Sequence, residues 1–430
     1  MKPRLVIVDG VRTPFSKAGT DLARHDAVEL GRTAVTSLLR RTALDPGLVD
    51  EVIFGCVSQP AEAANIARVI ALRSGIPEHV PAVTVHRNCA SGIEAITQAY
   101  EKMCAGRGRV FVVGGTESMS QMPLLFSQRA ADKFSRLARA KTVIQKLSAA
   151  VSFRPRDFKP RIGLQLGLTD PVCGLNMGET AELLAREFSI SREEQDAFAL
   201  ESHRRAVAAR TKLAEEITPV FPSALRTPQS ALTADNGPRE NQSMEALAKL
   251  RPVFDKKFGA VTAGNSSQIT DGAVALLVME VERARELGLA SLGALVDYAV
   301  AGCNPSHMGL GPLFAMAKLE RQCDLRVSDA DLIEINEAFA AQVLAVLKCA
   351  NSPEFARQHL QRDTPLGTIS RDKLNVNGGA IALGHPVGAT GARLILTSLK
   401  ELQRRNGHHA LVSLCVGGGQ GAALWLERMT

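Results

Sequence analysis

Apolar runs and amphipathic helical segments alternate along the first 120 residues. Between the runs, apolar residues recur at helical spacing, as Ala27, Leu30, Ala34 and Leu38 do. Buried strands are expected at 4–13, 49–59, 82–88 and 109–120, and helices at 26–42, 65–75 and 91–106. Glycines follow the last two helices as stop signals. This alternation predicts the α/β fold class.

A similar order returns near the C-terminus. The pattern predicts strand, loop and helix over 330–350, strand, Gly-rich loop and helix over 375–407, and strand, Gly-rich loop and strand over 409–427. Cys89 and His385 each stand in the loop before a helix that is followed by a buried strand and a glycine loop. The order of elements therefore indicates two similar halves.

The chain between the halves is more polar and more helical. Two helices are expected over 178–210, the second capped at Ser191. Residues 254–288 return to strand, loop, strand and helix, as if the first half resumes after an insertion. We expect a first half of residues 1–121 plus 255–288, an inserted loop domain of 122–254 and a second half of 289–430.

Composition excludes several classes of protein. The chain of 430 residues is 45% apolar and 22% charged, as in an ordinary globular protein with two to three domains. One Trp and two Tyr argue against a base-stacking platform and so against nucleic acid. The eight cysteines form no C-x-x-C pair, which argues against a metal site of that type. With no secretory signal and no membrane-spanning apolar run, a cytoplasmic location is expected.

Four short stretches carry candidate chemistry: "NCASG" at 88–92, "NEAF" at 336–339, "GGAIALGHPVGATG" at 378–391 and "CVGGGQG" at 415–421. Taken singly, each has an ordinary explanation as strand core, a helix cap or a turn. Together they follow predicted strands, whose carboxyl ends gather around one crevice in α/β sheets. Two thiols, an imidazole and an amide there suit acyl transfer. The helix after Cys89 is expected to favour its thiolate.

These motifs resemble those of thiolases, the acetyl-CoA acyltransferases. The resemblance runs from "VDGVRTPF" at 8–15 to "CVGGGQGAAL" at 415–424, through "GGTESMS", "NMGETAE" and "VTAGNSSQITDGA". It implies two α/β halves layered as α/β/α/β/α, with a loop domain inserted into the first. The implied reaction is thiolytic cleavage of 3-oxoacyl-CoA to acetyl-CoA and a shortened acyl-CoA, reversible as a Claisen condensation.

The resemblance also implies roles for single residues. Cys89 is the nucleophile, His385 activates it and holds a thioester oxygen, and Cys415 is the acid/base. Asn336 positions a water in one oxyanion hole, and the backbone N–H groups of Cys89 and Gly417 form the other. CoA and acyl-CoA are expected as substrates, with no metal and no permanently bound cofactor. The residues expected along the pantetheine arm of CoA are Met177, Ser267, Ala338 and Phe339.

The positive charge is concentrated in one segment. Residues 121–170 hold ten Lys or Arg against three Asp, which equals the +7 of the whole chain. Within this segment, 130–150 places Phe134, Leu137, Ala140, Ile144 and Leu147 at the spacing of one amphipathic helix. Three interpretations of the basic segment 129–161 are open. It is a helix face exposed to solvent, its cations attract the phosphates of CoA, or it contacts an anionic membrane or a partner protein.

The insertion resembles that of the thiolase subunit of the fatty-acid-oxidation complex. The sequence departs from that branch at Asn336, where those subunits commonly carry His. A biosynthetic acetoacetyl-CoA thiolase specific for short chains is the alternative subtype. A ketoacyl-synthase-type condensing enzyme would not need Cys415, and a retired scaffold would not retain all the reacting residues. By analogy with the family, a homodimer or dimer of dimers is expected.

Overall fold

The computed structural model describes residues 3–221 and 231–429. Its main sheet has ten strands and is mixed: β3 pairs in parallel with β4 and β5, β10 pairs in parallel with β11, and the other pairs are antiparallel. The spatial order is β10 (Leu332–Ile335), β11 (His409–Val416), β12 (Gln420–Glu427), β9 (Gly293–Gly302), β1 (Leu5–Arg12), β8 (Thr270–Glu280), β5 (Val110–Glu117), β3 (Glu51–Gly55) and β4 (Ala82–Val85), with β2 (Ser16–Lys17) beside β8.

Alternate residues of the long strands enter different hydrophobic clusters. In β8, Leu276 packs in the cluster of α3 and α16, whereas Leu277 packs in that of α1 and α2. In β11, Val412 joins the α3 and α16 cluster, whereas Leu411 joins that of α12 and α13. These helices are α1 (Ala27–Thr42), α2 (Ile66–Arg73), α3 (Ser91–Cys104), α12 (Gly311–Gln322), α13 (Ala340–Ala350) and α16 (Val387–Arg405). Successive strand residues point to opposite faces, so both faces of each half are covered.

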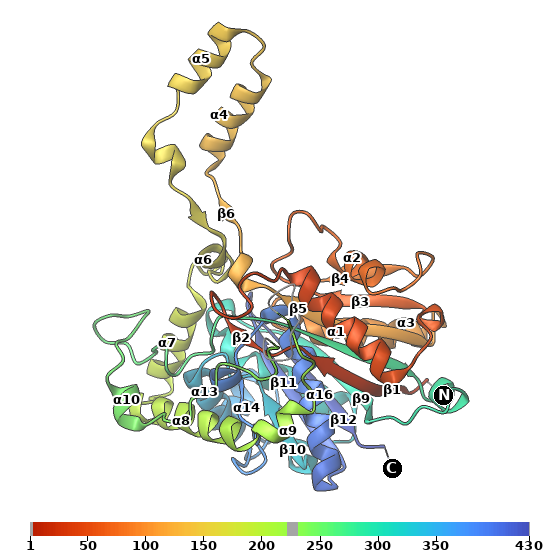
Figure 1. The fold of residues 1–430 in the computed structure, drawn as a ribbon. Coiled ribbons are helices and arrows are strands. Elements are labelled where there is room, and N and C mark those ends of the chain that lie inside the picture. Colours follow the sequence, from red (N-terminus) through yellow and green to blue (C-terminus); the bar gives the residue numbers. More distant parts are fainter. Residues whose placement is uncertain (1–2, 222–230, 430) are drawn as a thin grey trace.

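The clusters define five layers. Helices α3 and α16 contact each other and strands of the sheet, and α16 touches both β5 and β11 (Figure 1). The other helices cover the two outer faces, and the short pairing of β1 with β9 joins the halves. The predicted α/β/α/β/α fold is confirmed. Burial on both faces explains why the central strands are nearly continuous apolar runs.

Short elements complete the body. The predicted cap is present: the Ser191 hydroxyl accepts from the Glu194 N–H at the start of α8. The further helices are α7 (Met177–Glu187), α8 (Arg192–Ala208), α9 (Arg210–Ala214), α10 (Met244–Ala248), α11 (Val281–Glu286), α14 (Pro353–His359) and α15 (Ala380–Leu383). The 3-10 turns are η1 (Pro46–Leu48), η2 (Met119–Gln121), η3 (Pro155–Phe158), η5 (Pro305–Leu310) and η6 (Val327–Asp329). Within the described ranges, no helix is long and apolar enough to cross a membrane.

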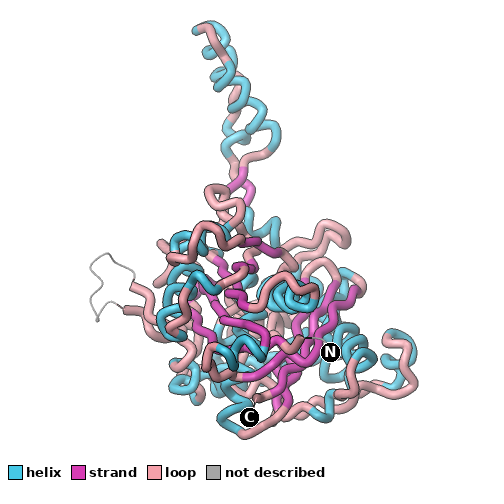
Figure 2. Tube along the Cα trace, turned by 90° about the vertical axis from the view of Figure 1, so that its right-hand side faces the viewer, coloured by secondary structure: helices cyan, strands magenta, loops and turns pink. Residues whose placement is uncertain are grey.

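Residues 124–162 form an arm that projects from the body (Figures 1 and 2). The arm leaves and returns through a two-stranded ribbon, and its phenylalanines form a partly exposed cluster in which the rings of Phe134 and Phe153 lie 4.8 Å apart. Its elements are β6 (Leu124–Leu125), α4 (Gln128–Arg139), α5 (Val143–Val151), η3 and β7 (Arg161–Ile162), and α6 (Gly163–Gly167) follows.

The prediction of one helix over 130–150 is wrong. Ala140 is extended, with φ −68° and ψ 121°, and ends α4. Thr142 then begins α5 with a capping box, in which its hydroxyl accepts from the Gln145 N–H. A side chain that accepts hydrogen bonds from the free backbone N–H groups at a helix N-terminus favours a new helix starting there over continuation of the previous one. The predicted apolar face is therefore divided between two antiparallel helices.

Two predicted strands are also absent. At 375–377 the chain turns, because Asn375 has a φ of +46° and its side-chain amide donates to the Ile335 carbonyl. The first strand expected in 254–288 is reduced to an isolated bridge between Pro252 and Thr262. His385 therefore follows the short helix α15 and not a strand, contrary to the sequence pattern.

Candidate active site

One cavity of about 300 Å³ collects most of the predicted residues. Cys89 reaches it from the turn before α3, His385 from the turn before α16, and Cys415 from the end of β11. Of the residues predicted to contact CoA or the oxyanion, Met177, Ser267, Ala338, Phe339 and Gly417 also line it. The remaining walls are apolar except at Asn88, Asp170 and Thr169.

Two glycines bring Cys89 and His385 to the same end of the central helices. A Cβ atom placed on Gly92 of α3 would lie 2.6 Å from the backbone nitrogen of Ala392. A Cβ atom on Gly391 of α16 would lie 2.6 Å from the backbone nitrogen of Ile93. The helices therefore touch backbone to backbone, and any larger side chain at the crossing would push them apart.

The turn that presents Cys89 is held by its neighbours. Asn88 has a φ of +43°, in the left-handed region that Asn tolerates better than most residues. Its Nδ2 donates to the Gly417 carbonyl at 2.7 Å, which ties the Cys89 turn to the loop after Cys415. The Ser91 hydroxyl donates to the Asn88 carbonyl at 2.7 Å. Sequence reasoning missed Asn88, although an Asn before a helix is a signal for such a turn.

Burial raises the pKa of both cavity thiols. Burial raises the pKa of Cys89 to about 11, although the N–H groups of Gly417 and Cys89 itself act to lower it. Burial, with the nearby Cys89, raises the pKa of Cys415 well above its ordinary value. Burial therefore opposes the backbone N–H groups at the start of the helix, which were expected to favour the thiolate of Cys89.

Hydrogen bonds around His385 fix which ring nitrogen carries the proton. The Thr390 hydroxyl donates to the Pro386 carbonyl at 3.0 Å, and its oxygen lies 2.6 Å from His385 Nδ1. Because the hydroxyl has one hydrogen and gives it to Pro386, Nδ1 is the donor to Thr390, and Nε2 is the unprotonated nitrogen that faces the amide donor of Asn336. Burial and then the charge of Arg393 lower the pKa of His385 to about 4, so the imidazole is neutral at neutral pH.

Asn336 lies behind His385, below the cavity surface. It is fully buried directly after β10, and its backbone N–H donates to the Ser413 carbonyl at 3.0 Å. Its Nδ2 is 3.5 Å from His385 Nε2, at the limit of a hydrogen bond. Its Oδ1 accepts no hydrogen bond from any described residue. The four predicted chemical groups are thus adjacent, with Asn336 contacting the cavity through His385.

The segments predicted to contact CoA are joined to one another. The Ser267 N–H donates to the Ala338 carbonyl at 2.9 Å, and Phe339 precedes α13. A Cβ atom on Gly417 would lie 3.2 Å from the Met177 sulfur, so the glycine allows this close approach. Among the described residues, no group of three or more His, Cys, Asp or Glu side chains could hold a metal ion.

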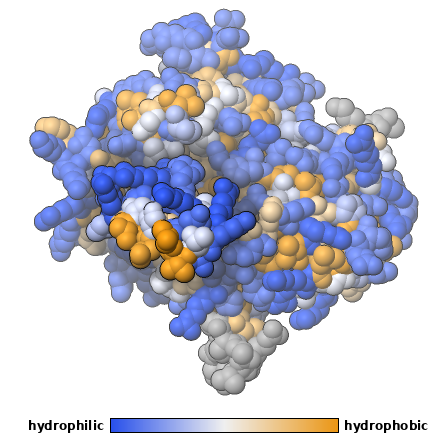
Figure 3. Space-filling view, turned by 90° about the horizontal axis from the view of Figure 1, so that it is seen from above, coloured by the Kyte–Doolittle hydropathy of each residue, from blue (hydrophilic) through white to orange (hydrophobic). Residues whose placement is uncertain are grey.

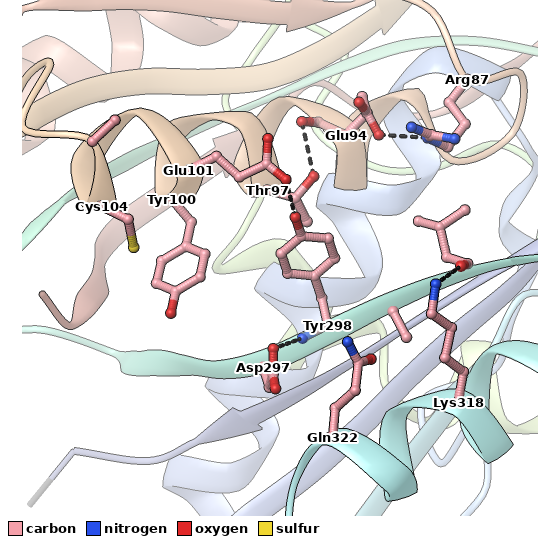
Figure 4. Close-up of a pocket in the computed structure, with 13 residues that line it drawn as sticks. Arg87, Glu94, Thr97, Tyr100, Glu101, Cys104, Asp297, Tyr298, Lys318 and Gln322 are labelled. Atoms are coloured by element: carbon pink, nitrogen blue, oxygen red, sulfur yellow. Dashed lines mark hydrogen bonds and ion pairs between the residues drawn. The ribbon is translucent and has the colours of Figure 1, made fainter. Parts of the chain in front are cut away.

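A larger cavity, of about 680 Å³, contains none of the predicted chemical groups (Figure 4). Its charged side chains already have partners. Arg87 bonds Glu94 at 2.5 Å, the Tyr298 hydroxyl donates to Glu101, and Lys318 donates to the Val300 carbonyl at 3.0 Å. We therefore assign the chemistry to the smaller, apolar cavity.

Comparisons with known proteins match nearly the whole chain. The chain matches the thiolase N-terminal domain over residues 5–282 and the thiolase C-terminal domain over 289–428. It is 42% identical to a 3-ketoacyl-CoA thiolase of Serratia proteamaculans, over 99% of this chain and 97% of that protein. An Escherichia coli 3-ketoacyl-CoA thiolase is 41% identical with the same coverage.

Solved structures give the same result. The Bacillus anthracis acetyl-CoA acetyltransferase superposes with a TM-score of 0.86 at 38% identity, covering 100% of this chain and 99% of that one. Human mitochondrial 3-ketoacyl-CoA thiolase in complex with CoA gives 0.85 at 35% identity, covering 100% and 98%. With both domains matched and the fold shared from end to end, the chain belongs to the thiolase family.

Proposed function

We propose that the protein cleaves 3-oxoacyl-CoA with CoA to give acetyl-CoA and a shortened acyl-CoA, a reaction that also runs backwards as a Claisen condensation. The observation that carries this function is the meeting of two thiols and an unprotonated imidazole nitrogen in one apolar cavity. Purified protein given CoA and 3-oxoacyl-CoA should release acetyl-CoA. No turnover at any chain length would contradict the proposal.

The first half-reaction begins at Cys89. Its sulfur attacks the 3-keto carbon while its proton passes to His385 Nε2. The bond between C2 and C3 then breaks, Cys415 protonates C2, and acetyl-CoA leaves. Because the thiol and the imidazole are both neutral at rest, the proton moves as the carbon–sulfur bond forms rather than beforehand.

The second half-reaction returns the acyl group to CoA. The Cys415 thiolate takes the proton of the incoming CoA thiol, whose sulfur attacks the thioester on Cys89. When Cys89 leaves, it recovers its proton from His385. Each thiol therefore has a separate task, and the site ends in its starting state.

The substrate oxygen atoms that become negatively charged during the reaction need hydrogen-bond donors held in fixed positions. The N–H groups of Cys89 and Gly417, which already act to lower the pKa of the Cys89 thiol, are the proposed donors to the acyl-enzyme oxygen. The protonated His385 Nε2 and a water bound by Asn336 are the proposed donors to the thioester oxygen of acetyl-CoA. A single such donor contributes about 10²–10³ in rate. We assign the pantetheine arm to Met177, Ser267, Ala338 and Phe339, which line the same cavity.

Thr390 positions His385 in this scheme. Thr390→Val removes the acceptor for Nδ1–H, so the proton is free to move to Nε2 and block the base. We expect kcat to fall about 10–100-fold, as when the second partner of a functional His is removed, with KM for CoA nearly unchanged. Thr390→Ser keeps the hydroxyl and should restore kcat. Equal losses in both variants would contradict the tautomer assignment.

We further propose a homodimer or dimer of dimers in the cytoplasm. Support for self-association comes from β4, an edge strand of the main sheet in the described chain. A reducing compartment suits the mechanism, because Cys89 and Cys415 react only as unoxidised thiols.

The end of the arm is the proposed site of contact with other assemblies. Its tip patch, defined as Val143, Ile144, Leu147 and Val151 of α5, is 65–82% exposed. Figure 3 shows apolar residues gathered on the arm among hydrophilic ones. The neighbouring Arg139, Lys141 and Lys146 are exposed. An apolar face beside cations suits an anionic membrane surface.

Vesicle binding tests this contact. The protein should co-sediment with phosphatidylglycerol vesicles, less so as salt rises, and weakly with neutral phosphatidylcholine vesicles. Val143→Asp with Ile144→Asp should remove the binding and leave thiolysis unchanged. Leu72→Asp is the matched control, because Leu72 is 46% exposed on α2 of the body. Failure of the unaltered protein to bind anionic vesicles would contradict membrane contact. The tip patch would then be assigned to contact with a partner protein of a multienzyme complex.

A further inference from the structure

Consecutive glycines form the whole connection between β11 and β12. Val416 at the end of β11 pairs with Gln420 at the start of β12, and only Gly417, Gly418 and Gly419 lie between them. Gly418 and Gly419 have φ values of +90° and +79°, in the region that favours glycine. Glycine has more backbone freedom than any other residue, so this connection needs outside contacts to hold one conformation.

One N–H group of this connection must point in a fixed direction. The Gly417 N–H is directed at the Cys89 sulfur in the resting site: burial raises the pKa of that thiol most, and this N–H acts against burial. In the acyl-enzyme, the same donor must reach the oxygen of the acyl group on that sulfur. The peptide unit that carries the donor can tilt unless the next peptide unit is also held.

The next peptide unit joins Gly417 to Gly418, and side chains from outside the hairpin engage both of its ends. Asn88 Nδ2 donates to its carbonyl oxygen at 2.7 Å. Its N–H is directed toward the carboxylate of Asp170, which is buried. Burial acts to raise the pKa of Asp170, but nearby N–H groups, among them that of Gly418, lower it.

Further hydrogen bonds hold the far side of the hairpin. Arg87 Nη1 donates to Gln420 Oε1 at 3.2 Å, and the Cys303 N–H donates to the Gly419 carbonyl at 2.7 Å. These contacts lie beyond the peptide unit next to the oxyanion donor. The contact from Asn88 is made to Gly417 itself.

We propose that Asn88 is a positioning residue, whose Nδ2–H holds the Gly417 carbonyl and thereby fixes the Gly417 N–H in the oxyanion hole. This inference rests on the proposed thiolysis at Cys89. Because Asn88 directly precedes Cys89, one residue sets both donors of the hole. Its left-handed turn orients the Cys89 N–H, and its amide orients the Gly417 N–H. Loss of the amide should misdirect the second donor and leave the first in place.

Two variants remove the amide and keep the turn. Asn88→Asp retains the shape of the side chain, and Asn88→Gly adds no charge; both residue types tolerate the φ of +43° at this position. An effect shared by both variants therefore comes from the missing amide. We expect kcat for thiolysis to fall about 10–100-fold in each, with KM for CoA nearly unchanged, since a whole donor contributes about 10²–10³.

Asn406→Asp is the matched control. Asn406 also has a positive φ, of +54°, but it is exposed at the end of α16 and does not line the cavity. This variant should match the unaltered enzyme in kcat and in KM.

The direct readout is the infrared carbonyl stretch of the acyl-enzyme. Each variant is combined with Cys415→Ala and acetylated with acetyl-CoA, with and without an isotopic label at the carbonyl carbon, so that the difference spectrum shows the acetyl group on Cys89. Hydrogen bonds to a carbonyl oxygen lower its stretching frequency. We expect a higher frequency in both Asn88 variants than in Cys415→Ala alone, and no change with Asn406→Asp.

Three results would overturn the inference. An unchanged stretching frequency in both Asn88 variants would mean that Asn88 serves only the local fold, even if kcat falls. A kcat within about twofold of the unaltered enzyme would mean that the amide is not needed. Complete loss of acetylation in both variants would contradict a role limited to one of two donors. Absence of an acetyl group on Cys89 in Cys415→Ala itself is a different result, which would refute the proposed reaction.

Discussion

Cys89→Ala is expected to abolish thiolysis, with a loss in kcat of at least about 10⁴-fold. The variant has no sulfur to accept the acyl group. Cys415 cannot replace it, because Cys415 lies at the end of β11 and is itself needed for proton transfer. Acetyl-CoA should leave no acyl group on the variant, as intact-protein mass spectrometry would show.

Cys104→Ala provides the control for Cys89→Ala. Cys104 ends the same helix that begins after Cys89, is exposed, and does not line the cavity of Cys89. This variant should keep normal turnover and normal acylation. Turnover retained by Cys89→Ala would remove Cys89 from the role of nucleophile.

Cys415→Ala is expected to separate the two half-reactions. The variant retains Cys89 and His385, so acetyl-CoA should still acylate it once, because a CoA thiolate is a stable enough anion to leave without being protonated by Cys415. Turnover should fall about 10²–10⁴-fold, the range for loss of a general acid–base group, because no thiol remains to protonate C2 or to accept the CoA proton. Stopped-flow and steady-state assays measure the two quantities separately.

Cys323→Ala is the control for Cys415→Ala. Cys323 is partly buried after α12 and packs in an outer hydrophobic cluster. It should turn over normally, whereas Cys415→Ser should fail, because a hydroxyl is a far weaker acid than a thiol. Normal turnover in Cys415→Ala would contradict its role in proton transfer.

The parts of the site that could be predicted from the sequence are those with local signals. Cys89, His385 and Cys415 stand beside glycine motifs at the ends of periodic segments, and their combination, together with the family resemblance, marked them as candidates. The layered fold followed from alternating strand and helix patterns and from the family resemblance. The structure confirms this fold and brings the three residues to one cavity.

Features that depend on distant contacts could not be predicted. The proton on His385 Nδ1 depends on where the Thr390 hydroxyl donates, and the Asn88 turn depends on the Gly417 carbonyl. The resting thiol at Cys89 follows from burial by the whole fold, which a local helix-dipole argument omits.

The central claim is that the acyl group passes through a thioester on Cys89. Its most direct test is to mix Cys415→Ala briefly with acetyl-CoA, quench at low pH, and map the acetylated peptide by mass spectrometry. The account predicts one acetyl group per chain, on the peptide that contains Cys89. An acetyl group on any other residue, or none at all, would contradict it.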